Sequence, residues 1–139
     1  AQRLARTGCA PAGVVLLDTY EATETSALTK FQNELVGGMF DREAMFTPMD
    51  GCRLTAMSWY FGLFGIWEPE RVPVPSLLVR SSEPLVPDGP DGPRPKHEWQ
   101  TAWQVADSAV DVPGTHFTMM EKHAGTTAQA VQEWIRKNV

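Results

Sequence analysis

The sequence predicts an α/β fold with a mostly parallel sheet, and three short apolar runs are the main reason. The runs are residues 14–17 (VVLL), 77–79 (LLV) and 109–112 (AVDV). The first two are apolar on both faces, which is typical of parallel strands covered by helices on both sides. The last segment instead has apolar residues at helical spacing, which favours a helix packed on the sheet.

The first residues have helical spacing without a capping residue, and Gly8 follows them as a helix stop. We therefore expect residues 1–6 to be the end of a helix that begins upstream. On this interpretation residues 1–139 are the C-terminal portion of one domain, and the N-terminal half of the domain is missing from the sequence.

Residues 26–67 separate the first two predicted strands and show helical periodicity. The apolar positions form two sets, Leu28, Phe31 and Leu35, then Leu54, Met57, Phe61 and Phe64. The region is longer than a simple crossover helix and is rich in Met, Phe and Trp. It is predicted to be a helical lid insertion over an apolar ligand, with two ordinary helices packed on the sheet as the alternative.

The remaining elements follow in order. Residues 84–95 contain five prolines and two glycines and are predicted to be a surface loop. The final helix is expected to bury one stripe, composed of Ala124, Ala128, Val131 and Ile135. Thr126 and Gln129 are spaced as a capping box at its start.

Composition excludes several classes of function. Twelve Lys and Arg against 17 Asp and Glu leave a net charge of −5, which argues against a nucleic-acid or acidic-membrane partner. No apolar run approaches the roughly 20 residues of a membrane span. Cys9 and Cys52 are too few for a disulfide scaffold or a Cys-rich metal site, so no metal is expected. They fit a reduced compartment, and we expect a cytoplasmic location.

Two side chains are candidates for acid–base chemistry. Asp18 directly follows the first strand, and His116 follows the third after a Pro113–Gly114 turn. The carboxyl ends of parallel strands share one edge, where ligands bind in open α/β sheets. A carboxylate there can orient an imidazole and stabilise its cation. The alternatives are that Asp18 caps the next turn and that His116 is structural. Glu83, Asp107 and Asp111 are the rival acids, with Glu83 the strongest.

The order of acid before base matches the Ser, Asp, His order of α/β-hydrolases. Those enzymes carry the serine in a Gly-x-Ser-x-Gly elbow, which does not occur in these 139 residues. The serines present all lack that setting: Ser26, Ser58, Ser76, Ser81, Ser82 and Ser108. The nucleophile is therefore expected upstream, and the 139 residues alone are predicted to be inactive on thioesters.

Three segments together resemble a specific family. Residues 13–20 (GVVLLDTY), 74–85 (VPSLLVRSSEPL) and 112–120 (VPGTHFTMM) are similar to the terminal thioesterase domains of modular type I polyketide synthases. Residues 40–43 (FDRE) and 53–57 (RLTAM) resemble the lid region of that family. The resemblance extends over the whole chain.

The resemblance implies an α/β-hydrolase fold and a chain-terminating enzyme of antibiotic biosynthesis. Such a domain takes a polyketide acyl chain from the phosphopantetheine arm of an acyl carrier protein onto its serine. It then releases the chain by macrolactonisation or hydrolysis, without another cofactor. The resemblance assigns Asp18 as the orienting acid, His116 as the base and Tyr20 as an aromatic residue that lines the substrate chamber. Residues 21–23 and Thr115 depart from the family pattern and leave the substrate shape open.

Two other functions remain as alternatives. One is an α/β-hydrolase-like binding module without a nucleophile, and the other is an esterase acting on small esters. A homodimer is also left open, because members of the family dimerise through N-terminal helices that are absent from these residues.

Overall fold

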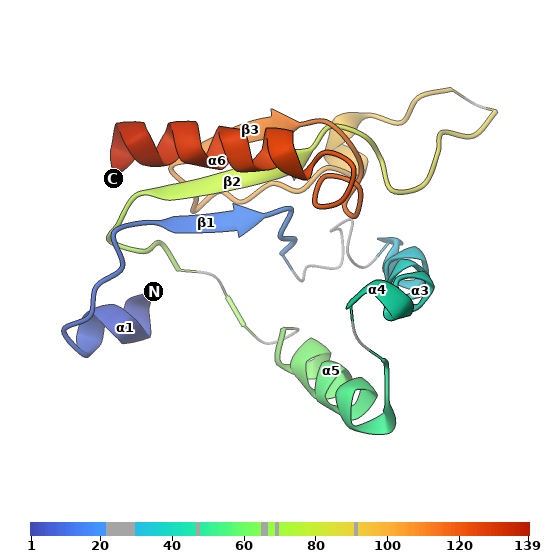
Figure 1. The fold of residues 1–139 in the computed structure, drawn as a ribbon, viewed down its shortest axis with the longest axis horizontal. Coiled ribbons are helices and arrows are strands. Elements are labelled where there is room, and N and C mark those ends of the chain that lie inside the picture. Colours follow the sequence, from blue (N-terminus) through green and yellow to red (C-terminus); the bar gives the residue numbers. More distant parts are fainter. Residues whose placement is uncertain (22–29, 47, 65–66, 69, 91) are drawn as a thin grey trace.

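The computed structural model describes residues 1–21, 30–46, 48–64, 67–68, 70–90 and 92–139. Its elements alternate between helices and strands, as expected for an α/β fold (Figure 1). The elements are α1 (Gln2–Arg6), β1 (Val14–Leu17), α3 (Gln32–Asp41), α4 (Glu43–Phe46), α5 (Gly51–Phe64), β2 (Ser76–Ser81), the 3-10 helix η1 (Lys96–Glu98), β3 (Ser108–Val112) and α6 (Ala124–Asn138).

The three predicted strands form one parallel sheet in the order β1, β2, β3. In the register, Leu17 is opposite Val79, and Ser81 is opposite Val112. β1 has the predicted bounds, whereas β2 continues to Ser81 because strand pairing extends beyond the apolar run. Since all three strands run the same way, the residues that follow them meet at one edge of the sheet.

Helix α6 covers one face of this sheet (Figure 1). The fully buried core lies between them and consists of Leu77, Val79, Val112 and Met119. Side chains of α6 pack on this cluster, including Val131 and Trp134. Burying a Leu, Val or Met side chain stabilises a fold by about 1.5–3 kcal/mol. The core therefore fixes the strand ends on which the site is built.

The predicted buried stripe of α6 is only partly correct. Val131 packs on the core, but Ile135 is 44% exposed and Ala128 is exposed. The buried face instead includes Thr127 and Trp134, whose indole Nε1 donates to Ser108 Oγ at 2.9 Å. The large indole has more apolar area to bury than the alanines in the predicted stripe. The helix is therefore rotated toward Trp134.

The predicted capping box of α6 is wrong. The helix begins at Ala124, after His123, and no side-chain hydrogen bond caps it. Thr126 lies within the first turn, and Gln129 donates to Glu133 instead. The backbone N–H of Thr127 already bonds to the carbonyl of His123 at 3.0 Å, which starts the helix earlier than the side chains suggest.

The region between β1 and β2 is helical where the structure describes it. Leu35, Leu54, Met57 and Phe61 are half-buried as predicted apolar positions, and Leu28 lies outside the described residues. In Figure 1, α3 and α4 lie beyond the end of the sheet, and α5 lies below β1 in this view. On α5 the side chains of Trp59 and Tyr60 are 70% and 62% exposed.

No helix within the described ranges is long and apolar enough to cross a bilayer.

Candidate active site

Asp18 ends β1 in an unusual backbone conformation. Its φ is +41°, in the left-handed region, where Asp and Asn are among the few side chains tolerated. Its N–H still donates to the carbonyl of Val79 at 2.8 Å, so the residue stays attached to the sheet. The chain turns immediately after the last strand pair, and the carboxylate lies at the sheet edge with an exposed fraction of 1%.

The buried carboxylate of Asp18 is surrounded by donors. Oδ1 accepts from the backbone N–H of Ser81 at 2.9 Å. Oδ2 accepts from Ser81 Oγ and from the hydroxyl of Tyr20, both at 3.2 Å, and lies 3.0 Å from His116 Nδ1. A buried charge is tolerated only when its lone pairs are satisfied in this way. The donors therefore come from the ends of all three strands and hold the carboxylate in a fixed position.

The loop that carries His116 is tied to the end of β2. Gly114 has φ +99°, and its N–H donates to Glu83 Oε1 at 3.2 Å. The N–H of Glu83 donates back to the carbonyl of Gly114 at 3.1 Å. Thr118 Oγ1 then accepts from the N–H of Thr115 at 2.8 Å and closes the next turn. These contacts place His116 above the strand ends.

The imidazole of His116 has one nitrogen engaged and one available. The Asp18 carboxylate can only accept, so Nδ1 carries the hydrogen and Nε2 is the basic nitrogen of the neutral ring. Within the part of the chain that the structure describes, Nε2 makes no hydrogen bond. The His116 side chain is 30% exposed, so Nε2 can reach a reactant.

Tyr20 completes the environment of the acid. Its ring is tilted against the imidazole with centroids 5.9 Å apart, and its hydroxyl lies 3.3 Å from the Trp99 carbonyl as well as near Asp18. Burial first, and then the negative charge of Asp18, raise the pKa of the Tyr20 hydroxyl far above its ordinary value. Tyr20 therefore remains a neutral donor to Asp18.

The rival acids are engaged elsewhere. Glu83 binds the Gly114 turn, as described above. Asp107 precedes β3, at the opposite end of the sheet, and accepts from the N–H and Oγ of Ser76. Asp111 pairs with Arg80 on the neighbouring strand. The structure brings Asp18, and none of these three, to His116.

Ser81 is a site residue that sequence reasoning considered only as a nucleophile. It is 1% exposed, and both its N–H and its hydroxyl donate to Asp18. Its carbonyl accepts from Gln100 Nε2 at 2.8 Å, which anchors it from the other side. The signal in the sequence was its place at the end of the second strand, on the same edge as Asp18.

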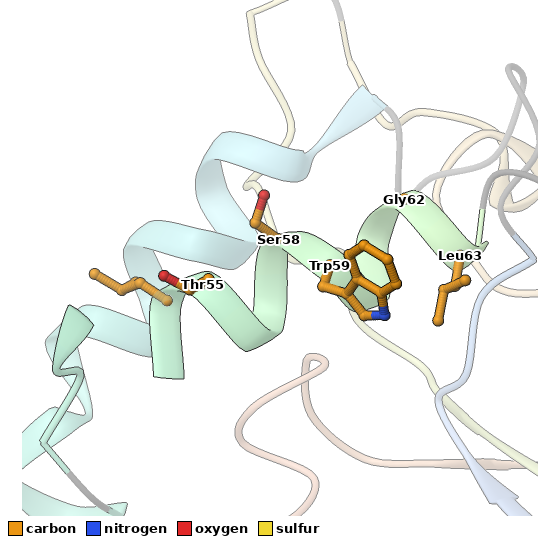
Figure 2. A pocket seen from close by; sticks show the side chains of 6 residues that line it. Thr55, Ser58, Trp59, Gly62 and Leu63 are labelled. Atoms are coloured by element: carbon orange, nitrogen blue, oxygen red, sulfur yellow. The ribbon is translucent and has the colours of Figure 1, made fainter. Parts of the chain in front are cut away.

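The described residues contain no cluster of three His, Cys, Asp or Glu side chains that would hold a metal ion. A groove of about 700 Å³ lies along α5 instead, and its described lining residues all belong to that helix (Figure 2). Its lining residues are Leu54, Thr55, Ser58, Trp59, Gly62 and Leu63. Neither Asp18 nor His116 lines it.

The chain is similar to segments of much larger proteins. It is 46% identical over 139 residues to polyketide synthase GfsE of Streptomyces halstedii. That match covers 97% of this chain and 3% of GfsE. It is 38% identical over 128 residues to erythronolide synthase EryA3 of Saccharopolyspora erythraea, covering 92% of this chain and 4% of that protein. It is 34% identical over 131 residues to the spectinabilin polyketide synthase system protein NorC of Streptomyces orinoci. That match covers 92% of this chain and 6% of NorC.

Its homologues are polyketide synthases. The chain spans between 3% and 6% of the length of these relatives, so it corresponds to a short segment of each. No protein-family model matches it.

Proposed function

We propose that the chain is the C-terminal portion of an α/β-hydrolase thioesterase domain that releases a polyketide from a polyketide synthase. The supporting observation is the buried Asp18 carboxylate 3.0 Å from Nδ1 of a partly exposed His116. This is the acid–base half of a Ser-His-Asp triad. The similarity to polyketide synthases supports an acyl chain made by such an enzyme as the proposed substrate of this site.

In the proposed reaction His116 moves the protons. Nε2 takes the proton of a serine hydroxyl as its oxygen attacks the thioester carbonyl. The carbon–sulfur bond then breaks, and the imidazolium returns the proton to the departing thiol of the carrier arm. Next, Nε2 deprotonates an internal hydroxyl of the chain or a water, which attacks the acyl-serine. The ester bond between the acyl carbon and the serine oxygen then breaks, the imidazolium returns the proton to that oxygen, and the product is a macrolactone or a free acid.

Asp18 acts in both halves of this cycle. Its negative charge favours the imidazolium that forms after each proton abstraction, and its hydrogen bond keeps Nε2 as the basic nitrogen. The Ser81 donors and the Tyr20 hydroxyl keep the carboxylate in place. Because the group is 1% exposed, its charge acts on His116 with little screening by water.

The serine and the oxyanion donors are proposed to come from another part of the same domain. Among the described residues β1 pairs with β2 alone, and the side chain of Leu17 on this outer strand is 38% exposed. A surface groove beside it is lined by Leu17, Met120, Ala124, Ala128 and Ile135 among others. An uncovered strand edge beside apolar side chains is a site for a further strand and its helix. Such a strand would end at the same sheet edge as Asp18.

The segment of residues 26–67, which is helical where the structure describes it, is proposed as the lid of this site. α3 lies beyond the strand ends and contacts the His116 loop through an ion pair between Arg42 and Glu121. The exposed Trp59 and Tyr60 of α5 supply apolar surface for an acyl chain. The proposed partners are an acyl carrier protein and its polyketide chain.

The test uses the full-length polyketide synthase protein that contains these residues, with an acyl chain loaded on its carrier. His116→Ala is expected to reduce formation of the acyl-serine at least about 10³-fold in single-turnover mass spectrometry. His97→Ala is the matched control, because His97 is an exposed residue of η1. Near-normal acylation in His116→Ala would remove this residue from the mechanism. Turnover of soluble esters without turnover of the carrier-bound chain would favour a small-ester esterase.

A further inference from the structure

Arg42 joins the end of α3 to the loop that carries His116. Its Nε forms an ion pair with Glu121 Oε1, and its Nη2 lies 3.4 Å from Oε2 of the same carboxylate. Both side chains are about one-fifth exposed, at 22% and 21%. A forked contact of this kind fixes orientation as well as distance, and its partial burial limits screening. The two residues are 79 positions apart, so the pair links two separate segments of the chain.

Phe117 lies between this ion pair and the candidate base. The Arg42 guanidinium sits 4.1 Å above the centre of the Phe117 ring. The same ring meets the imidazole of His116 edge-on, with centroids 5.1 Å apart and an interplanar angle of 76°. Tyr20 contacts the imidazole as well, at 5.9 Å. The imidazole is thus held by two aromatic rings in addition to its hydrogen bond to Asp18.

Gly38 lets α3 approach the Phe117 ring. A Cβ atom at position 38 would lie 2.2 Å from the ring carbon Cε2 of Phe117, a distance that non-bonded atoms do not reach. The carbonyl of Gly38 also accepts from Arg42 Nη1 at 3.0 Å. At the preceding position, Gly37, an added Cβ would have nothing within 4 Å. The close approach is therefore specific to Gly38.

We propose that Gly38, Arg42, Phe117 and Glu121 form a clasp by which α3 positions the imidazole of His116 against Asp18. Arg42 and Phe117 are then positioning residues: they act on the reaction only through His116. The physical reason is that the imidazole can rotate about its side-chain bonds unless its faces are packed, and rotation would break the bond from Nδ1 to Asp18. The assignment of a catalytic benefit rests on the function proposed above.

The clasp predicts a change in His116 that does not depend on turnover. When the Nδ1 bond to Asp18 is populated less, the imidazole leaves its two ring contacts more often and is more exposed to solvent. Substitutions that conserve charge isolate this effect, because removing the cation of Arg42 would also change the electrostatic environment of the imidazole. Gly38→Ala displaces the ring, and Arg42→Lys keeps the charge but lacks the planar fork.

The experiment measures the rate at which the imidazole C2 hydrogen exchanges for deuterium at one fixed pH, by peptide mass spectrometry of the full-length protein. We expect His116 to exchange at least about twofold faster in Gly38→Ala and in Arg42→Lys, because its imidazole is then more accessible to water. The controls are Gly37→Ala on the same helix and Arg53→Lys, whose ion pair with Asp50 is exposed and lies on α5. In both controls His116 should exchange at the wild-type rate. Protection of the buried Met119 from oxidation verifies that each variant is folded.

A second readout connects the clasp to catalysis. Both variants should lower kcat for acyl release about tenfold with little change in KM, since they misplace the base without altering substrate contacts. The clasp is refuted if His116 exchanges at the wild-type rate in both folded variants, or if the controls change equally. If the wild type forms no acyl-serine at all, the proposed function fails, while the exchange rate still decides whether the clasp positions His116.

Discussion

The imidazole Nδ1 of His116 lies 3.0 Å from Oδ2 of Asp18, although 98 positions separate the two residues. The contact exists because β1 and β3 flank β2 in a parallel sheet, so their carboxyl ends open onto one edge. Ser81, at the end of the central strand, supplies the donors between them. The sheet therefore brings the two strand ends together, and the loop after β3 places His116 against Asp18.

Replacing Asp18 by Asn should preserve the packing and remove the charge. The amide can donate to Nδ1, which would move the hydrogen to Nε2 and leave no basic nitrogen toward the serine. We expect acyl-serine formation to fall by about 10³–10⁴-fold in single-turnover assays. Asp111→Asn is the control, because Asp111 pairs with Arg80 on the sheet and not with His116. Equal rates for the two variants would contradict the role given to Asp18.

Tyr20 should make the fold sensitive to alkaline pH. Burial and the Asp18 charge raise the pKa of the Tyr20 hydroxyl in the folded state. The folded chain therefore binds the hydroxyl proton more tightly than the unfolded chain does. This contribution is complete below the unfolded pKa of about 10 and is lost as the pH rises beyond it. The wild type should therefore lose stability above about pH 10, while Tyr20→Phe should lose less over the same interval.

The unfolding of Tyr20→Phe can be followed by the urea dependence of Met119 oxidation, since Met119 is fully buried in the native state. Near neutral pH the variant should be less stable by about 0.5–1.5 kcal/mol, because the hydroxyl bond to Asp18 is lost. Tyr60→Phe is the matched control, since Tyr60 is 62% exposed on α5. An identical loss of stability above pH 10 in wild type and Tyr20→Phe would refute this prediction.

Gly114→Ala should disturb the loop that carries His116. The residue has φ +99°, and an added Cβ would lie 2.6 Å from Thr118 Oγ1 and 3.0 Å from the N atom of Met119. We expect a loss of about 1–3 kcal/mol in stability, measured by the same oxidation method, and slower acyl release. Gly125→Ala is the control, because its Cβ would meet nothing within 4 Å and alanine favours the helix. Wild-type behaviour of Gly114→Ala would show that the turn tolerates other backbone angles.

Asp107 should contribute to stability in a pH-dependent way at the other end of the sheet. Hydrogen bonds from Ser76, and then the Arg71 guanidinium, lower the pKa of its carboxyl. A lowered pKa stabilises the fold above the unfolded value of about 3.9, and this contribution is lost as the pH falls through the folded value. Asp107→Asn should therefore unfold at lower urea than the wild type at pH 7. The difference between the two curves should shrink as the pH falls below about 3.9; a difference that stays constant there would contradict the assignment.

The strands were predictable because their signal is local. An apolar run such as residues 14–17 must be buried on both faces, and a parallel strand is the element that does so. Placing Asp18 and His116 at one edge followed from that alone. The buried face of α6 was harder to predict. Whether Ile135 or Trp134 is buried depends on which side chains of the sheet each one packs against.

The contacts between distant segments could not be predicted by the same reasoning. Glu83 looked like a rival acid, yet it binds the Gly114 turn. The sequence does not indicate that Arg42 and Glu121 form an ion pair, because each charged side chain could equally be solvated by water. In the sequence Ser81 does not differ from other serines at strand ends, and only the fold shows that its hydroxyl donates to Asp18.

By itself the amino-acid sequence determined the α/β class, the three strands and the two side chains at their shared edge. These features follow from hydrophobic patterns among residues that are neighbours in the sequence. Only the tertiary structure decided which donors hold Asp18, how His116 is packed and how α3 meets its loop. Those outcomes depend on distances of a few ångströms between residues far apart in the chain, which the register of the sheet sets and the local pattern does not encode.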